Sequence, residues 1–176
     1  MALLGAMVLA VPIAQAGPWT SVGSAGVIDD DAFVFAGASP GVRAVLNGPT
    51  LSLSPAVAPQ QPVRVRYNVV DVFDRGGFAG PIRLAANFVD NGANAQIVLY
   101  LFEQSMASTA SRLLLSLNSN AYTPSTGPQV QSVSAGCNFR LDFTRNAYWI
   151  EAVLIRTAST GAPALNQLRV IDEVLC

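Results

Sequence analysis

The chain alternates apolar and polar residues along most of its length, with a period of two. Residues 63–69 read VRVRYNV, so the valines and the tyrosine fall on one face and the arginines and the asparagine on the other. Successive side chains of a strand point to opposite faces, and this pattern therefore predicts a strand with one buried face. The doubled valine at 69–70 reverses the alternation, which is typical of a bulge or of a crossing between two sheets.

The same period recurs further along the chain. Residues 95–104 (AQIVLYLFEQ) are apolar on both faces, which predicts a central strand that is covered on both sides. The C-terminal residues 165–175 mix helical and strand spacings, and their β-branched residues favour a strand. Four other segments alternate in the same way and are also expected to be strands: 82–88, 113–117, 139–143 and 148–154.

Clusters of Gly, Pro, Asn and Ser separate these segments and predict turns. Asn91-Gly92 predicts a tight hairpin turn, because both residue types accept positive φ. Residues 105–111 (SMASTAS) predict a longer hairpin loop. Residues 38–62 are rich in Pro, Ala and Gly, and predict an irregular segment with an edge strand at Thr50 to Ser54.

About ten short strands with little or no helix predict an all-β fold. The expected architecture is an antiparallel β-sandwich, jelly-roll-like in its connections. Residues 17–176 are enough for one such domain.

Residues 1–16 carry no charge and end in Ala14-Gln15-Ala16, a small-x-small pattern. They predict a signal peptide that is cleaved between Ala16 and Gly17. No apolar run in the chain reaches the length of a membrane-spanning helix, so no membrane span is expected. We therefore expect a secreted bacterial protein, extracellular or periplasmic.

Two cysteines, Cys137 and Cys176, are the only thiols of the chain. In an exported protein such a pair predicts a disulfide bond. Closing this loop would stabilise the fold by about 4 kcal/mol on the chain-entropy model. A metal site or a reactive thiol pair is a weaker alternative, because the spacing is not CxxC and the chain has no histidine.

The composition excludes several classes of function. The 10 basic residues are all arginines, are balanced by 11 acidic residues and form no stripe, so no nucleic-acid partner is expected. Without His or Lys there is no Ser-His-Asp triad and no Schiff base. Hydrolysis by two carboxylates is the enzyme class left, and Asp142 and Glu151 are its candidates on outward strand positions. Solvated carboxylates are much commoner, so we assign no catalytic residue and expect no enzyme.

Clusters of side chains with oxygen atoms are candidates for a calcium site. Asp29, Asp30 and Asp31 are consecutive, and Asp90 belongs to a second polar cluster. Consecutive residues of a strand face opposite sides, so at most two of the three neighbours converge. An exposed acidic turn is favoured; no cofactor is expected, and calcium is kept as the alternative.

Five rings are candidates for a platform that stacks against sugars: Trp19, Tyr67, Tyr122, Tyr148 and Trp149. Tyr148 and Trp149 are adjacent, so a strand places one ring on each of its faces. Packing in the core is the commoner fate of a ring.

Three hypotheses of function follow. The chain is 51% hydrophobic with a mean hydropathy of +0.40, and this apolar surplus predicts self-association. The first hypothesis is therefore a secreted, non-enzymatic protein with a structural, adhesive or assembly role at the cell surface. The alternative is a carbohydrate-binding module that holds a glycan through Trp149 or Trp19, with or without calcium. A carboxylate-dependent glycoside hydrolase is the third.

Overall fold

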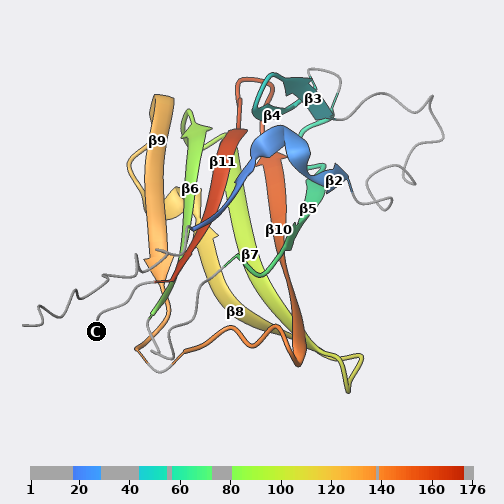
Figure 1. The fold of residues 1–176 in the computed structure, drawn as a ribbon. Coiled ribbons are helices and arrows are strands. Elements are labelled where there is room, and N and C mark those ends of the chain that lie inside the picture. Colours follow the sequence, from blue (N-terminus) through green and yellow to red (C-terminus); the bar gives the residue numbers. More distant parts are fainter. Residues whose placement is uncertain (1–17, 29–43, 55–56, 73–80, 138, 173–176) are drawn as a thin grey trace, which may run out of the picture.

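The computed structural model describes residues 18–28, 44–54, 57–72, 81–137 and 139–172. In these ranges the chain forms eleven strands in two antiparallel sheets, with short 3-10 helices at Gly23–Ala25 and Ser119–Ala121 (Figure 1). None of the helices in the described ranges has the length and apolarity to cross a membrane.

Sheet A has the order β3-β4-β11-β6-β9, and β1 pairs with β11 beside β4. Sheet B has the order β2-β5-β10-β7-β8. The strands of sheet A are β1 (Trp19–Val22), β3 (Ala44–Asn47), β4 (Thr50–Leu53), β6 (Ile82–Asp90), β9 (Ser125–Ser134) and β11 (Ala164–Asp172). Those of sheet B are β2 (Val27–Ile28), β5 (Val63–Val69), β7 (Ala95–Ser105), β8 (Ser111–Asn118) and β10 (Asn146–Arg156).

The chain passes repeatedly from one sheet to the other. Strands β4, β6, β9 and β11 lie in sheet A, whereas β5, β7, β8 and β10 lie in sheet B. Only β7 and β8 are both consecutive and paired among these eight strands. Two interleaved four-stranded sheets of this kind are the jelly-roll arrangement. The predicted fold class is confirmed.

The core lies between the two sheets and is built from alternate residues of each strand. In β5 the pattern is strictly alternating, with Val63, Val65, Tyr67 and Val69 buried and the residues between them exposed. Because one set of side chains fills the core, the other set of each strand in sheet B faces away from sheet A. The largest fully buried side chains are Leu51, Ile82, Leu84, Phe88, Ile97, Leu99, Leu101, Leu117, Leu141, Ile150, Leu154 and Leu165.

The predicted tight hairpin at Asn91-Gly92 is wrong. The strands on either side, β6 and β7, belong to different sheets, so residues 91–94 connect the two layers. Gly92 does take a positive φ of 132°, but Asn91 does not. Asn91 instead donates to the carbonyl of Thr160 at 2.8 Å and accepts from the amide of Ala162 at 2.8 Å. Turn-forming residues reveal a reversal of the chain, but not whether it returns in the same sheet.

The predicted strand at 139–143 is also wrong. These residues form a loop, in which Leu141 is fully buried and Phe139 and Phe143 pack against the core. Their alternation therefore comes from a loop that covers one end of the sandwich. The loop is fixed by the hydroxyl of Tyr148, which accepts a hydrogen bond from the amide of Asp142 at 2.7 Å.

Three strand features were not expected from the sequence. Strand β9 includes Pro128 and reads as a turn-rich segment; Pro is tolerated there because β9 is an edge strand. The expected strand near Thr50 is confirmed as β4, but its predicted edge position is wrong: β4 pairs with β11 on one side, and on the other β3 forms a hairpin with it across Gly48, whose φ is 56°. In β8 a register shift turns Leu113 outward, where it is 49% exposed instead of sharing the inner face with Leu117.

Candidate functional site

The side chains of sheet B that point away from sheet A lie on one face, here called the outer face of sheet B; most of them are partly or fully exposed, whereas Val98 and Val153 are buried. The pairing of β5, β10, β7 and β8 arranges these side chains in rows that run across four strands. The residues between them along each strand are buried in the core, which fixes the direction of this face. The three rows are Asn68, Trp149, Phe102, Leu113; Arg66, Glu151, Tyr100, Ser116; and Arg64, Val153, Val98, Asn118.

Three aromatic rings lie side by side on this face. Trp149 of β10 stacks on Phe102 of β7, with ring centroids 5.3 Å apart and an angle of 21° between the planes. Tyr100 lies 6.0 Å from Phe102 and is tilted by 39°. Each of the three side chains is half-buried and keeps part of its surface in solvent. These three rings, here called the aromatic strip, form a partly exposed apolar surface with a fixed ring geometry.

Hydrogen-bonding side chains border the aromatic strip. The Nη1 atom of Arg64 lies 2.6 Å from Oε1 of Glu151, in an ion pair whose arginine is 46% exposed. Gln96 donates from Nε2 to Oδ1 of Asn118 at 3.2 Å. Asn68 is exposed in the same row as Trp149. The outer face of sheet B therefore presents rings beside amides and paired charges, a combination that suits a ligand with both apolar and hydroxyl-bearing surfaces.

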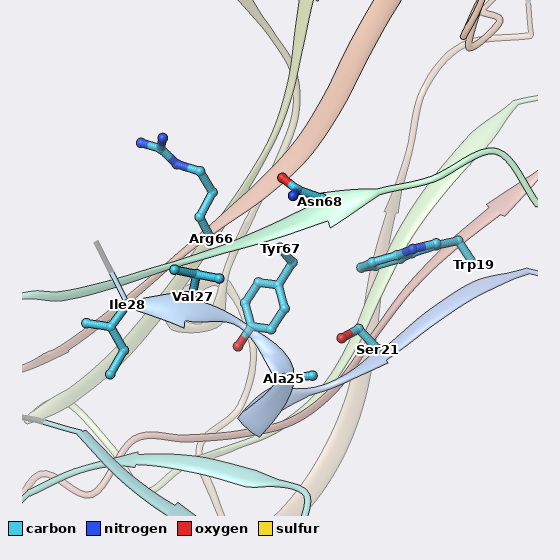
Figure 2. A pocket seen from close by; sticks show the side chains of 8 residues that line it. All are labelled: Trp19, Ser21, Ala25, Val27, Ile28, Arg66, Tyr67 and Asn68. Carbon is cyan, nitrogen blue, oxygen red and sulfur yellow. The ribbon is translucent and has the colours of Figure 1, made fainter. Parts of the chain in front are cut away.

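A cavity of about 510 Å³ opens at the edge of sheet B. Strand β2 pairs only with Val65 and Arg66, so the rest of β5 has no strand beside it on this edge within the described residues. In Figure 2 the ring of Tyr67 lies between the side chains of β2 and the indole of Trp19. The cavity is lined by Trp19, Ser21, Ala25, Val27, Ile28, Arg66, Tyr67 and Asn68.

The wall of this edge cavity is held by core residues. Tyr67 is 3% exposed, and its hydroxyl donates to the carbonyl of Gly23. Burial raises the pKa of Tyr67 well above its ordinary value, so the hydroxyl stays protonated at neutral pH. A Cβ atom on Gly26 would lie 2.6 Å from the same ring, so this segment of backbone can pack closely only as glycine.

The four candidate rings other than Tyr67 occupy different places. Trp149 lies on the outer face of sheet B, whereas Trp19 is 7% exposed and combines a core position with the cavity wall. Tyr148 points inward, and its hydroxyl donates to Oε2 of Glu103 at 3.0 Å. Burial raises its pKa. Tyr122 is half-buried beside the core and donates to the carbonyl of Ser132.

Phe102 and Tyr100 were missed as site residues. The two-sided apolar pattern of 95–104 predicted a strand covered on both faces, but these two rings are only half-buried. Trp149, the neighbour of Phe102 in the sheet, is 47 positions further along the chain than Phe102. The sequence did show aromatic residues in both predicted strands. That their rings lie together follows only from the pairing of β7 with β10.

The two candidate carboxylates do not meet. Glu151 lies on the outer face of sheet B, whereas Asp142 is in the end loop and is tied to the inward-pointing Tyr148. Asp142 accepts hydrogen bonds from the side chain and the amide of Thr144, and the side-chain bond is the main reason its pKa is lowered. This pair does not support two-carboxylate hydrolysis.

Calcium is not tested by this structure. Asp90 is 2% exposed, and its Oδ1 atom accepts from the amide of Gly92 at 3.0 Å. The three consecutive acids, 29–31, lie outside the described residues. Within the described ranges no group of three or more His, Cys, Asp or Glu side chains is placed to hold a metal.

The predicted disulfide also stays a prediction. Cys137 is exposed in a turn after β9, and no cysteine in the described part of the chain is free. Its expected partner, Cys176, lies outside the described residues, as does the predicted signal peptide 1–16.

Comparisons with known proteins give structural likeness only. No protein-family model and no curated protein matches the chain. A solved structure described as "CBM4 structure and function" matches with 12% identity and a TM-score of 0.40, covering 89% of this chain and 95% of that one. A family 11 carbohydrate-binding module from Clostridium thermocellum, in complex with a β-1,3-1,4-mixed-linked tetrasaccharide, matches with 11% identity and a TM-score of 0.43, covering 93% and 92%.

A third match is weaker. The empty particle of cowpea mosaic virus has 15% identity and a TM-score of 0.26, over 55% of this chain and 58% of that one.

Proposed function

We propose that this chain is a non-catalytic carbohydrate-binding module that holds a glycan on the outer face of sheet B. The observation that carries the proposal is the stack of Trp149 on Phe102 with Tyr100 beside it. Sugar rings have apolar C–H faces and hydroxyl edges, and aromatic rings bind the former while amides and charged groups bind the latter. This proposal takes up the alternative hypothesis from the sequence, in place of the structural or adhesive role.

The surroundings of the aromatic strip support a sugar ligand over a purely apolar one. The ion pair of Arg64 and Glu151 and the amides of Asn68 and Asn118 lie on the same face as the rings. Each offers donors or acceptors that hydroxyl groups can use. A hydrophobic partner would bury the donors and acceptors that these groups still direct to solvent without pairing them, at a cost of about 1 to 3 kcal/mol for each one that is buried.

Binding without catalysis agrees with the placement of the carboxylates. Glu151 is the acidic residue in the three described rows of the outer face, and its partner there is Arg64. Glycoside hydrolysis needs two carboxyl groups that flank the bond to be broken. The face thus offers contacts for a glycan, but no such pair. An exported location, expected from the N-terminal segment, forms part of the proposal.

The test begins with an array of polysaccharides and ends with calorimetry on the polysaccharide that binds best. Trp149→Ala is expected to weaken binding at least about thirtyfold, because a central ring of an interface is typically worth 2 kcal/mol or more. Trp149→Phe keeps a ring and is expected to retain part of the affinity.

The matched control is Val130→Ala on the far side of the molecule. Val130 is 69% exposed on β9 of sheet A, so its removal is expected to leave binding unchanged. An array with no bound polysaccharide, or equal binding by wild type and Trp149→Ala, would contradict the proposed function.

A further inference from the structure

The edge cavity is continuous with the outer face of sheet B. Arg66 and Asn68 line the cavity and also belong to two rows of that face. Asn68 is the direct neighbour of Trp149 in the sheet. Adjacent strands are about 4.8 Å apart, so the cavity begins one strand away from the aromatic strip.

The lining of the cavity suits a small polar ring. Trp19 and Tyr67, which are 7% and 3% exposed, form an apolar wall with little free ring surface, and Ser21 adds a hydroxyl. The amide of Asn68 lies at the rim, on the outer side of β5. None of the eight lining residues is acidic, and one, Arg66, is basic. A volume of about 510 Å³ falls in the range of about 300 to 1,000 Å³ that is usual for small-molecule sites, which combine apolar walls with a few polar groups.

One wall of the cavity is preformed, because Trp19 and Tyr67 are parts of the core. Trp19 is 7% exposed and Tyr67 is 3% exposed, and the hydroxyl of Tyr67 is bonded to Gly23. Close backbone packing at Gly26 restricts movement of the segment opposite. A ligand that enters such a site loses little affinity to reorganisation of the protein.

We propose that this cavity is a second subsite for a sugar unit of the same glycan. The chain of sugars crosses the outer face along Phe102, Trp149 and Asn68 and turns over β5, so that its end enters the cavity. The inference rests on the proposed function, and adds to it that the ligand is recognised by its end or by a branch.

The geometry predicts a dependence on ligand length. From β7 to the far side of β5 there are about three strand spacings, or about 14 Å. A short oligosaccharide covers only the aromatic strip, whereas a longer one also reaches the cavity. Affinity is therefore expected to rise by about tenfold at the length that fills both.

The experiment uses oligosaccharides of graded length from the polysaccharide that the array identifies, titrated by calorimetry. Ser21→Phe places a ring in the cavity, because Ser21 lines it. The matched control is Thr20→Phe, one position earlier. The side chain of Thr20 is exposed on the opposite face of β1 from Ser21, and Thr20 lies beside Arg169 of β11 in the sheet. Ser21→Phe is expected to abolish the gain at the longer length and to keep binding of the short ligand; Thr20→Phe is expected to behave as wild type.

A melting curve shows whether Ser21→Phe is folded. If Ser21→Phe does not fold, Ala25→Leu replaces it, because Ala25 lines the same cavity from the 3-10 helix. Equal affinity for short and long ligands in wild type, or an unchanged length gain in the folded cavity variants, overturns the subsite but leaves the proposed function standing. Loss of all binding in Trp149→Ala with the length gain still present in wild type supports both. Absence of binding to any polysaccharide overturns the proposed function itself.

Discussion

Adjacent residues of one strand in sheet B face opposite sides, one toward the core and the next toward solvent. Tyr148 and Trp149 are adjacent in β10, and the first is buried while the second stacks on Phe102. The alternation of a strand makes this split predictable from the sequence. Which of the two rings faces outward was not predictable, because it depends on the side of the sheet that sheet A covers.

Tyr67→Phe tests the buried hydroxyl in the wall of the edge cavity. Its bond to Gly23 is lost in the variant, which is expected to unfold at lower urea with a loss of about 1 kcal/mol at pH 8. The phenylalanine ring keeps the packing, so a larger effect is not expected. A variant as stable as wild type at pH 8 would show that this hydrogen bond contributes nothing.

Alkaline pH narrows the difference in stability between wild type and Tyr67→Phe. The pKa of Tyr67 is raised in the folded state, so above about pH 10 the unfolded chain loses this proton while the folded chain keeps it. Wild type should therefore lose about 1 kcal/mol more stability than Tyr67→Phe between pH 8 and pH 11. Urea unfolding of both proteins at the two pH values measures the difference, and equal losses would contradict the buried position of the phenol.

At the scale of elements, periodicity identified most strands but not their partners. The alternation in 63–69 and 82–88 predicted β5 and β6 with the correct buried faces. The loop at 139–143 has the same alternation without any ladder, because Leu141 reaches the core from outside the sheets. The alternation of apolar and polar residues shows which side chains are buried. Whether the buried side chains belong to a strand or to a loop depends on the tertiary arrangement.

The bulge in β8 gives two leucines of one strand different roles. Leu117 is fully buried and Leu113 is 49% exposed. Leu117→Ala is expected to lower the free energy of unfolding by about 2 to 5 kcal/mol, whereas Leu113→Ala should cost about 0.5 kcal/mol or less. Chemical denaturation of both variants checks the register; similar losses would mean that Leu113 faces the core, as the sequence alone suggested.

The connection between β6 and β7 is fastened to the turn between β10 and β11. Thr157 donates its amide to the carbonyl of Asn94 at 3.0 Å, and Asn94 donates to the hydroxyl of Thr160 at 3.0 Å. At Gly161 a Cβ atom would lie 1.8 Å from the oxygen of Asn94, so the two turns can approach only because this residue is glycine.

Gly161→Ala is accordingly expected to destabilise the fold by about 2 kcal/mol, through the overpacking of these two turns. Gly127→Ala in β9 is the matched control, because the nearest atom to its Cβ would be 3.8 Å away. Thermal unfolding of both variants is the measurement. A Gly161→Ala melting curve that overlies that of Gly127→Ala would contradict the close approach.

At the scale of the whole molecule, the order of strands brings the aromatic strip together. Trp149 and Phe102 come from β10 and β7, which are separated by β8 and β9 in the chain but are direct neighbours in sheet B. In this sheet β8 lies on the other side of β7, and β9 belongs to sheet A. The sequence predicted the sandwich and one of these rings. It could not predict the strip, since antiparallel pairing across 47 positions leaves no local trace.

The most direct test of the proposed function is a map of chemical-shift changes in the labelled protein as the bound oligosaccharide is added. The predicted result is that the largest changes fall on Trp149, Phe102 and Tyr100 on the outer face of sheet B. Changes confined to the opposite face of the molecule, at Thr20 and Arg169 of sheet A, would contradict the account.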